Sequence, residues 1–339
     1  MNKYVKSINS LKPRKKRKEI VLDLFAGAGG LALGFEANGF ETIGLEFNID
    51  CVNTYNNNLV GKCLQETITS KTKFPKADIV IGGPPCQPFS VGGKQKGSDD
   101  TRNGFPAFIE AIRQVEPKIF LFENVRGLLY KNRPYFDEVV SQLQNMGYYI
   151  EFQLFNTSFY GVPQKRERLV VIGIKSGNYT FPNRLQEIVT AGDAVGDLIN
   201  NEVPESKYLT QSMEGYVGRY EKASKCIRPR DLHLDQPART LTCRNLAGAT
   251  GDMHRVILEN GRRRRLTTKE AARLQSFPDW FRFKGSESSA FYQIGNAVPP
   301  LFAYHLASSF CEYLDSGIEV PEEKVKRCRH LYQSKLIEV

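Results

Sequence analysis

The chain has 339 residues and a formal net charge of +10, and 41% of its residues are hydrophobic. This length allows one large or two modest domains with an ample core, and the composition excludes a disordered or low-complexity chain. The excess of positive charge favours a polyanionic partner, nucleic acid before a membrane.

Cysteine usage limits the possible redox and metal chemistry. The chain has seven cysteines, an odd number, and no pair has the Cys-x-x-Cys spacing. This argues against a disulfide framework and a zinc ribbon, so we expect reduced thiols, no metal and a cytoplasmic protein. The N-terminus lacks an apolar signal core and no apolar run could span a bilayer, so we expect no membrane partner.

Residues 1–18 are polar and strongly basic, ending in a Lys-Pro-Arg-Lys-Lys-Arg-Lys run. A disordered tail is the common explanation of such a segment, and an arm that contacts phosphates is the alternative. We predict a basic flexible tail.

From residue 19 to about 175, short apolar runs alternate with helical patterns. The alternation predicts an α/β domain with a doubly wound, mostly parallel sheet, whose ligands bind at the carboxyl ends of the strands. The predicted strands are Ile20–Phe25, Glu41–Phe47, Ala77–Gly82, Lys118–Glu123, Tyr148–Asn156 and Arg168–Ile174. The predicted helices include Leu31–Asn38, Cys51–Asn58, Gly104–Val115 and Tyr135–Met146.

The alternation of strand and helix patterns stops in residues 176–265, which are rich in Gly, Asn, Thr, Arg and Pro. They predict a small, irregular second domain with short strands at Thr240–Arg244 and Arg255–Glu259. A helical pattern resumes at Thr267–Gln275, and the apolar stretch Pro299–Leu314 predicts a helix. We therefore expect residues 266–339 to return to the first domain.

The first strand ends in a glycine-rich turn, Asp23-Leu-Phe-Ala-Gly-Ala-Gly-Gly30. Such glycines let the backbone approach a ligand closely, although the G-x-G-x-x-G spacing of nicotinamide-binding proteins is not met. Glu46 ends the second strand, where an acid can accept hydrogen bonds from both ribose hydroxyls. Together these features suggest an adenosine-containing cofactor.

The segment Gly82-Gly-Pro-Pro-Cys-Gln-Pro-Phe-Ser90 follows a buried strand. Two prolines fix the backbone, so the Cys86 thiol is held at a rigid strand end as a candidate nucleophile. A buried structural cysteine is the alternative. Glu123 ends another buried strand on the same rim, where a carboxyl group can donate a proton, or can cap a helix instead.

Two further segments carry candidate residues. Arg166 and Arg168 alternate in an extended run, so both point to one face and could brace a carboxylate or donate to a carbonyl oxygen. A solvated charge run is the alternative there. Asn296 follows a glycine in a segment that suits a turn facing a ligand, or a turn without function.

These motifs, in this order, resemble the DNA (cytosine-5) methyltransferases, in the compact bacterial restriction–modification form. The resemblance covers about Ile20 to Leu314 and implies a Rossmann-like, S-adenosylmethionine-dependent catalytic domain with a small target-recognition domain. It implies transfer of a methyl group to cytosine C5 in a specific short DNA sequence, producing S-adenosylhomocysteine. It also implies host protection against a cognate restriction endonuclease.

The resemblance implies the catalytic roles. Cys86, in the Pro-Pro-Cys-Gln match, adds as thiolate to cytosine C6, which builds negative charge toward C5. Glu123, in the Glu-Asn-Val match, hydrogen-bonds the cytosine at N3 and its exocyclic amine. Arg168, in the Gln-x-Arg-x-Arg match, binds O2 and holds Glu123, and Arg166 lies near Cys86 and the target phosphate. No side chain is an obvious base for the C5 proton, and water can serve.

The same resemblance implies the cofactor-binding residues. Phe25 stacks near adenine, Gly27 and Gly29 let the backbone approach the amino-acid end, and Glu46 binds the ribose. Glu66 substitutes for the acid that relatives place on the adenine amine. Pro84, Asn296 and Val298 complete the cofactor site.

A base inside a duplex cannot reach such a site, so we expect the target cytosine to be flipped out. The loop Ser90–Asn103 would close over it, with Ser90, Lys94 and Gln95 contacting DNA. Arg239, Thr240 and Leu241 match the Thr-Leu region that supports the flipped strand, and Arg244 is a candidate for base readout. The resemblance implies duplex DNA as partner, and we expect a monomer.

Three alternatives remain. The first is the RNA-directed branch of the same fold, and the second is a DNA-binding relative that has lost catalysis. The third, a thiol-dependent oxidoreductase, is disfavoured by the glycine spacing.

Overall fold

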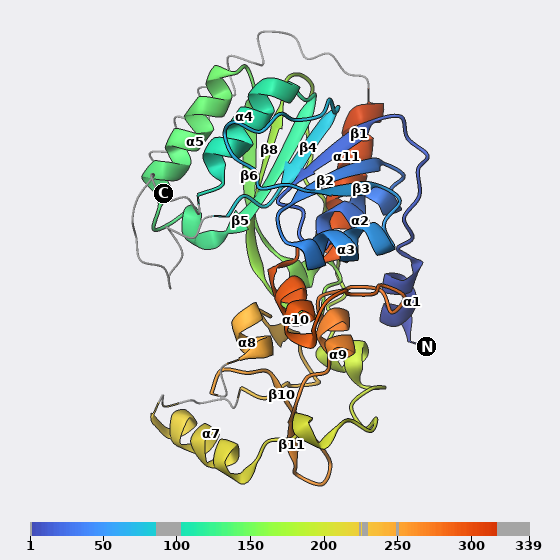
Figure 1. Cartoon of the computed structure of the whole chain (residues 1–339), viewed down its shortest axis with the longest axis vertical. Coiled ribbons are helices and arrows are strands. Elements are labelled where there is room, and N and C mark those ends of the chain that lie inside the picture. Colours follow the sequence, from blue (N-terminus) through green and yellow to red (C-terminus); the bar gives the residue numbers. More distant parts are fainter. Residues whose placement is uncertain (1, 86–102, 224, 226–229, 249–250, 317–339) are drawn as a thin grey trace.

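A computed structural model describes residues 2–85, 103–223, 225, 230–248 and 251–316. Four predicted site residues, Cys86, Ser90, Lys94 and Gln95, lie outside the described residues. In Figure 1 the chain forms an upper lobe around a sheet and a lower lobe of short elements, and α9 and α10 lie between them.

The upper lobe is built on a seven-stranded sheet of order β3-β2-β1-β4-β5-β8-β6. The pairs among β1 to β5 are parallel, and β8 runs antiparallel to both β5 and β6. The strand order reverses between β1 and β4, and doubly wound sheets bind their ligands at such a switch point. The strands are β1 Ile20–Leu24, β2 Glu41–Glu46, β3 Lys62–Gln65, β4 Ile79–Gly82, β5 Ile119–Val125, β6 Tyr149–Asn156 and β8 Glu167–Ile174.

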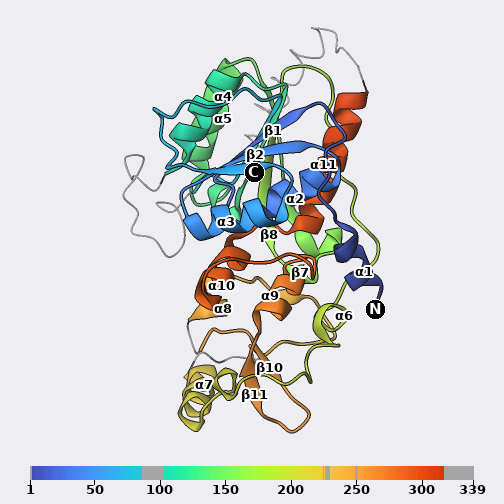
Figure 2. The ribbon, with the colours of Figure 1, turned by 45° about the vertical axis from the view of Figure 1, so that its right-hand side comes forward.

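Helices cover both faces of this sheet, which explains why its central strands are almost fully apolar. Side chains of α2, α3 and α11 belong to the core on one face, and those of α4 and α5 to the core on the other. Figures 1 and 2 show this three-layer arrangement from two directions. These helices are α2 Gly30–Ala37, α3 Ile49–Asn58, α4 Phe105–Val115, α5 Arg133–Asn145 and α11 Pro300–Asp315.

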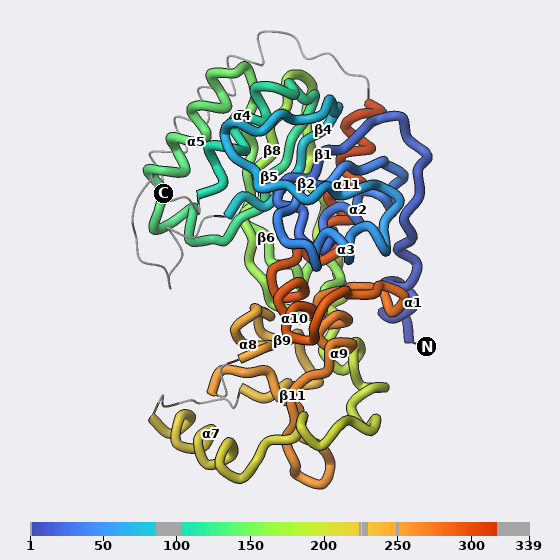
Figure 3. The backbone as a smooth tube through the Cα atoms, viewed as in Figure 1, coloured from blue at the N-terminus to red at the C-terminus, as the bar shows by residue number. Residues whose placement is uncertain are grey.

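Residues 2–18 are folded, so the prediction of a flexible tail is wrong for them. Helix α1 (Lys3–Ser10) buries Tyr4, Val5 and Ile8, and its N-cap Asn2 accepts a hydrogen bond from the Val5 amide. The composition of the segment hides these apolar residues between the lysines, and their burial explains why the helix packs on the protein. The tube in Figure 3 shows the chain rising from α1 along the edge of the molecule to β1.

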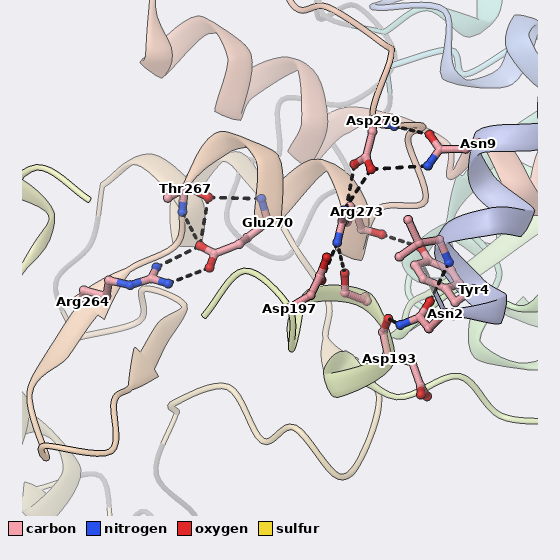
Figure 4. Close-up of polar contacts among 12 residues, drawn as sticks. Asn2, Tyr4, Asn9, Asp193, Asp197, Arg264, Thr267, Glu270, Arg273 and Asp279 are labelled. Carbon is pink, nitrogen blue, oxygen red and sulfur yellow. Dashed lines mark hydrogen bonds and ion pairs between the residues drawn. The ribbon is translucent and has the colours of Figure 1, made fainter. Parts of the chain in front are cut away.

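The basic residues of this segment have partners within the protein. Lys3 pairs with Glu187, Lys15 pairs with Glu41, and Arg17 lies 2.6 Å from Asp315 and 3.1 Å from Glu19. Helix α1 is fixed at the junction of the lobes, where Asn9 and Asp279 exchange hydrogen bonds (Figure 4). We define residues 2–18 as the N-terminal strap.

The lower lobe consists of short elements, as the loss of periodicity predicts. Helix α7, which the sequence did not indicate, lies at its far end (Figure 1). Its elements are α6 Ala191–Val195, α7 Gln211–Ala223, β9 Ala238–Arg239, α8 Cys243–Ala247, β10 Arg255–Ile257 and β11 Arg263–Arg265. The described residues include the 3-10 turns Arg126–Leu128, Thr157–Tyr160 and Glu205–Lys207.

The predicted strand at Thr240–Arg244 is wrong. Thr242 is instead the N-cap of α8, because its hydroxyl accepts from the Asn245 amide and the Asn245 side chain accepts from the Thr242 amide. This capping box starts a helix where β-branched residues suggested a strand. A two-residue strand, β9, pairs in parallel with β7 (Gln164–Lys165) just before it.

The chain returns to the upper lobe within residues 266–316, and residues 317–339 of the predicted segment lie outside the described residues. Helices α9 (Thr268–Leu274) and α10 (Glu287–Asn296) lead into α11, which packs against α2. Gly34 makes this packing close, because a side chain there would overlap Ala303. Among the described residues, no helix is both long and apolar enough to cross a membrane.

Candidate active site

The strand ends of β4 and β5 bring a carboxylate beside the Gly-Pro-Pro segment. Gly82 of β4 is paired with Phe122 of β5, so the residues that follow each strand lie next to one another. A Cβ atom built on Gly83 would lie 3.7 Å from Oε2 of Glu123. The Asn124 side chain donates a 2.9 Å hydrogen bond to the carbonyl oxygen of Pro84. Asn124 therefore fixes the chain two residues before Cys86, a role that the sequence reading missed.

The two described ends of the segment 86–102 also meet at this rim. The Gly104 amide donates to the Pro85 carbonyl oxygen at 2.9 Å, and a side chain at Gly104 would overlap the Pro85 ring. Pro85 and Gly104, which are described residues on either side of segment 86–102, therefore lie together at the start of α4. Its first residue, Cys86, is joined directly to Pro85.

Glu123 forms an ion pair with Arg168, as the resemblance implied. Arg168 Nε lies 2.7 Å from Glu123 Oε1, and each side chain is only 13% exposed. The antiparallel pairing of β5 with β8 brings these residues together, since Arg168 faces Val125 in the register. A charge-assisted hydrogen bond in a largely water-free position holds the carboxylate in one orientation. Its second oxygen, Oε2, faces Gly83.

Arg166 forms hydrogen bonds within the protein. Its side chain is buried, and it donates to the carbonyl oxygens of Leu241, Gly295 and Ala297 at 2.8–3.2 Å. Burial and the nearby Arg168 charge lower the pKa of Arg166. Its Nη1 and Nη2 atoms are thus bonded to carbonyl groups of two segments of the chain, and the expected contact of Arg166 with a target phosphate stays a prediction.

The acid that ends β2 faces the glycine turn after β1. Glu46 is buried, and its carboxylate accepts hydrogen bonds from the amides of Gly27 and Asn48, both at 2.9 Å. The amide of Glu66 donates to the carbonyl oxygen of Glu46 at 2.9 Å, which places Glu66 beside it with an exposed side chain. The predicted acids thus lie together at the strand ends.

The two glycines of the turn differ in their surroundings. Gly27 has a φ of +54°, and a Cβ atom there would meet no other atom within 4 Å. Gly29 has a φ of +84°, but its Cβ would lie 2.7 Å from Leu59 and 2.8 Å from Tyr55. Open space for a ligand therefore lies only at Gly27, whereas Gly29 permits packing of α2 on α3. The expected ligand contact of Gly29 has no support in this geometry.

Two aromatic residues lie at the strand ends. Phe25, with a φ of +57°, places its ring beside Gly104 at the Pro85 side of the rim. Phe47 directly follows Glu46, and 60% of it is exposed. An exposed aromatic ring next to the acid predicted to bind a ribose suits stacking on a purine. The sequence reading chose Phe25 for this role and missed Phe47, although its position directly after the acid was visible.

A buried acid completes this region. Asp23 on β1 is buried, and its Oδ2 atom has no hydrogen-bond partner among the described residues. Burial raises the pKa of Asp23 well above its usual value, and the neighbouring Glu46 charge raises it further. The raised pKa favours the neutral form of Asp23, so Glu46 supplies the negative potential beside the turn at Gly27, which suits a cationic ligand.

The segment after α10 reaches the same rim. The carbonyl oxygen of Val298 would lie 2.5 Å from a Cβ built on Gly30, so Val298 packs against the start of α2. Asn296 is exposed and is the last residue of α10 rather than part of an isolated turn. Burial raises the pKa of Tyr292, one helical turn earlier, and the nearby Cys243, Cys51 and Glu46 raise it further. Helix α10 thus faces the Glu46 side of the rim.

The predicted DNA-contacting residues of the lower lobe differ in availability. Arg239 is held by Asp252 at 3.1 Å, so its guanidinium is committed to an ion pair. Thr240 donates to the Lys165 carbonyl oxygen at 2.7 Å, and the Leu241 side chain is fully buried. Arg244 is exposed on α8 and lines a recess of about 350 Å³ with the stacked rings of Tyr216 and Tyr220.

The arginine run before α9 is internal in large part. Arg264 is buried and forms two hydrogen bonds with Glu270, at 2.7 and 2.9 Å (Figure 4). Arg262 and Arg263 pair with Glu205 and Glu214. This run therefore stabilises the lower lobe more than it offers charge to phosphates. The described residues hold no cluster of three or more His, Cys, Asp or Glu that suits a metal ion, and the absence of a metal stays a prediction.

Comparison with known proteins decides the family. The model of the C-5 cytosine-specific DNA methylases matches residues 20–312, most of the chain. The chain belongs to this family. It is a DNA (cytosine-5) methyltransferase, and S-adenosylmethionine is the methyl donor of such enzymes, so the family prediction from sequence is confirmed.

Curated relatives are restriction–modification enzymes. The Type II methyltransferase M.AplI of Arthrospira platensis is 54% identical over 292 residues, which cover 86% of this chain and 85% of the relative. M.NgoFVII of Neisseria gonorrhoeae is 30% identical over 378 aligned positions, covering 100% and 98% of the two chains. These relatives support the restriction–modification type that the sequence predicted for this methyltransferase.

Solved structures share the fold. A putative DNA modification methyltransferase encoded within an Escherichia coli prophage is 24% identical, with a TM-score of 0.66, and covers 88% of this chain and 100% of its own. The S. pombe Dnmt2 methyltransferase is 17% identical, with a TM-score of 0.69, and covers 87% and 99%. At these identities the likeness concerns the fold alone, and it confirms the predicted α/β methyltransferase architecture.

Proposed function

We propose that this methyltransferase acts on a flipped-out cytosine in a specific short duplex sequence, through a covalent bond between Cys86 and C6. The observation that carries the proposal is the Glu123–Arg168 pair beside the Gly83–Pro84 chain that leads into Cys86. A fixed carboxylate and a candidate thiol on one rim match the needs of addition to a pyrimidine ring.

Glu123 and Arg168 activate the base in this account. The Glu123 carboxyl group donates a proton to N3 and accepts a hydrogen bond from the exocyclic amine. The proton at N3 withdraws electrons from C6. Arg168 orients Glu123 and donates to O2, where negative charge increases as the thiolate adds. Cys86 attacks C6, the C5 carbon takes the methyl group, and loss of the C5 proton with release of the thiol restores the ring.

Burial of this pair supports base flipping. The side chains of Glu123 and Arg168 are both only 13% exposed. A stacked base in a duplex cannot bring its Watson–Crick edge to such a position, so extrusion is required. Segment 86–102 would then cover the extruded base, with Ser90, Lys94 and Gln95 as its DNA contacts.

S-adenosylmethionine supplies an electrophilic methyl group on a sulfonium centre. The residues present suit it, because Gly27 leaves space at its Cβ position and the buried Glu46 carboxylate provides negative potential beside it. Glu46 would hold the ribose hydroxyls, and Phe47 would cover the purine. Asn296 and Val298 would close the site from the α10 side.

The lower lobe would read the DNA. Arg244 is exposed at the recess beside Tyr216 and Tyr220, so it is the strongest candidate among the predicted residues for donation to guanine. Thr240 and Leu241 would support the extruded strand through their backbone. We further propose a cytoplasmic monomer whose methylation protects host DNA from a companion endonuclease.

The proposal is tested by measuring methyl transfer from S-adenosylmethionine, to duplex DNA and to tRNA, separately from DNA binding. Wild-type protein, Cys86→Ala and Glu123→Gln are each incubated with mixed-sequence duplex DNA, and methyl transfer and DNA affinity are measured separately. We expect Cys86→Ala to bind DNA but to transfer no methyl group, and Glu123→Gln to lose roughly 10²–10⁴-fold in rate. Turnover by Cys86→Ala, or transfer to tRNA in place of DNA, would overturn the assignment.

A further inference from the structure

Gln164 and Arg166 hold the backbone of Leu241 from both sides. The Gln164 Oε1 atom accepts from the Leu241 amide at 2.8 Å, and Arg166 Nη1 donates to the Leu241 carbonyl oxygen at 2.8 Å. Thr240 adds a bond from its hydroxyl to the Lys165 carbonyl oxygen. The Thr240–Leu241 segment, which would support the extruded DNA strand, is thus bonded to residues 164–166, which precede Arg168 in the chain.

The same two side chains reach the cofactor side. Arg166 Nη2 donates to the carbonyl oxygens of Gly295 and Ala297, both at 3.2 Å. Gln164 Nε2 donates to Gln275 Oε1, and Gln275 Nε2 donates to the Ala297 carbonyl oxygen at 2.7 Å. Ala297 lies between Asn296 and Val298, the residues that would close the cofactor site.

Water has little access to these hydrogen bonds, because both side chains are buried. Gln164 is fully buried and Arg166 is 2% exposed. A Cβ atom on Gly295 would overlap the backbone of Cys243, so α10 presses directly on the start of α8. Any movement of Leu241 must therefore break charge-assisted hydrogen bonds in a dry interior or carry Arg166 with it.

We propose that Gln164 and Arg166 are positioning residues that couple DNA binding in the lower lobe to closure of the cofactor site. A shift of the Thr240–Leu241 segment on DNA binding is transmitted through Arg166 to Gly295 and Ala297, and along the strand to Arg168. The inference rests on the proposed function, because it assigns DNA to the Thr240–Leu241 side of these hydrogen bonds and S-adenosylmethionine to the Gly295–Ala297 side.

Coupling between two sites is reciprocal, so it can be measured without catalysis. The dissociation constant of S-adenosylhomocysteine is determined with and without the duplex that the wild type methylates. We expect that duplex to tighten binding in the wild type within the usual range of about 5–150-fold. In Arg166→Lys the single amine cannot reach three carbonyl groups, and the enhancement is expected to fall to about 1.

The matched control is Lys165→Ala, which removes one positive charge from the exposed residue between Gln164 and Arg166. It should retain the wild-type enhancement. A second variant, Gln275→Met, breaks only the bonds to Ala297 and Gln164 and should also reduce the enhancement, so it decides the matter if Arg166→Lys does not fold. Thermal unfolding with and without S-adenosylhomocysteine identifies the variants that fold.

The outcomes separate the two proposals. If a folded Arg166→Lys or Gln275→Met protein keeps the wild-type enhancement, the proposed coupling through Gln164 and Arg166 is wrong. The proposed function would still stand. If Lys165→Ala loses the enhancement of S-adenosylhomocysteine binding to the same extent, the proposed coupling is also wrong. Positive charge, rather than the buried contacts, would then cause the enhancement. Failure of the wild type to methylate any duplex would instead overturn the proposed function.

Discussion

Replacing Gly27 and Gly29 separately by alanine distinguishes a ligand-binding glycine from a packing glycine. Both residues have positive φ, so each alanine costs about 1–2 kcal/mol of backbone strain. Only at position 29 would the new methyl group collide with neighbours, at 2.7 Å from Leu59 and 2.8 Å from Tyr55. Overpacking of this kind adds about 1–3 kcal/mol. We therefore expect Gly29→Ala to lower the free energy of unfolding by about 2–5 kcal/mol, and Gly27→Ala by about 1–2 kcal/mol.

Binding should show the opposite order. The Gly27→Ala methyl group enters the open space beside Glu46, so S-adenosylmethionine affinity should fall at least tenfold, which corresponds to about 1.4 kcal/mol. Urea unfolding measures the first quantity and titration calorimetry with S-adenosylmethionine the second. The reasoning fails if Gly27→Ala binds the cofactor like the wild type, or if it loses as much stability as Gly29→Ala.

Three further predictions concern charged groups. Arg168→Met leaves the Glu123 carboxylate without its partner, so DNA methylation should fall at least a hundredfold in single-turnover assays while S-adenosylmethionine affinity stays within about threefold; a parallel loss of affinity would contradict this separation. Burial lowers the pKa of His254 to about 3, so between pH 6.5 and 3 the unfolded state binds a proton that the folded state does not, and stability falls with decreasing pH. His254→Gln should remove about 2 kcal/mol of the loss between pH 7 and pH 5 in urea unfolding, and an unchanged pH dependence would refute the burial argument. Arg17→Ala should lower stability but leave the slope of log Kd for DNA against log salt unchanged, because Arg17 pairs with Asp315 and Glu19; a slope reduced by about 0.9 would mean that Arg17 contacts a phosphate.

Local sequence signals predicted the sheet and the position of Glu123 because both depend on strand ends. An apolar run followed by a polar residue predicts where a strand stops, and this placed Glu123 and Glu46 on one rim. The parallel pairing of neighbouring strands then brought Glu123 beside Gly83. The resemblance implied that Arg168 contacts Glu123, and the structure shows that the antiparallel pairing of β8 with β5 brings them together.

The errors arose where tertiary contacts override composition. Lysines in residues 2–18 suggested disorder, yet Tyr4 and Ile8 fill a space at α9 and α6 that no local pattern reveals. The local sequence does not distinguish Arg166 from Arg168, because both are arginines in the same extended run. Arg166 is buried because it bonds to Leu241 and Ala297, which are distant in sequence. Gly29 looked like a ligand contact because its packing partners lie on a different helix.

The measurement that tests the central claim most directly is methyl transfer from labelled S-adenosylmethionine to mixed-sequence duplex DNA, followed by analysis of the product nucleosides. The account predicts label in 5-methylcytosine from the wild type and none from Cys86→Ala. Label in another base, label in RNA alone, or 5-methylcytosine produced by Cys86→Ala would contradict it.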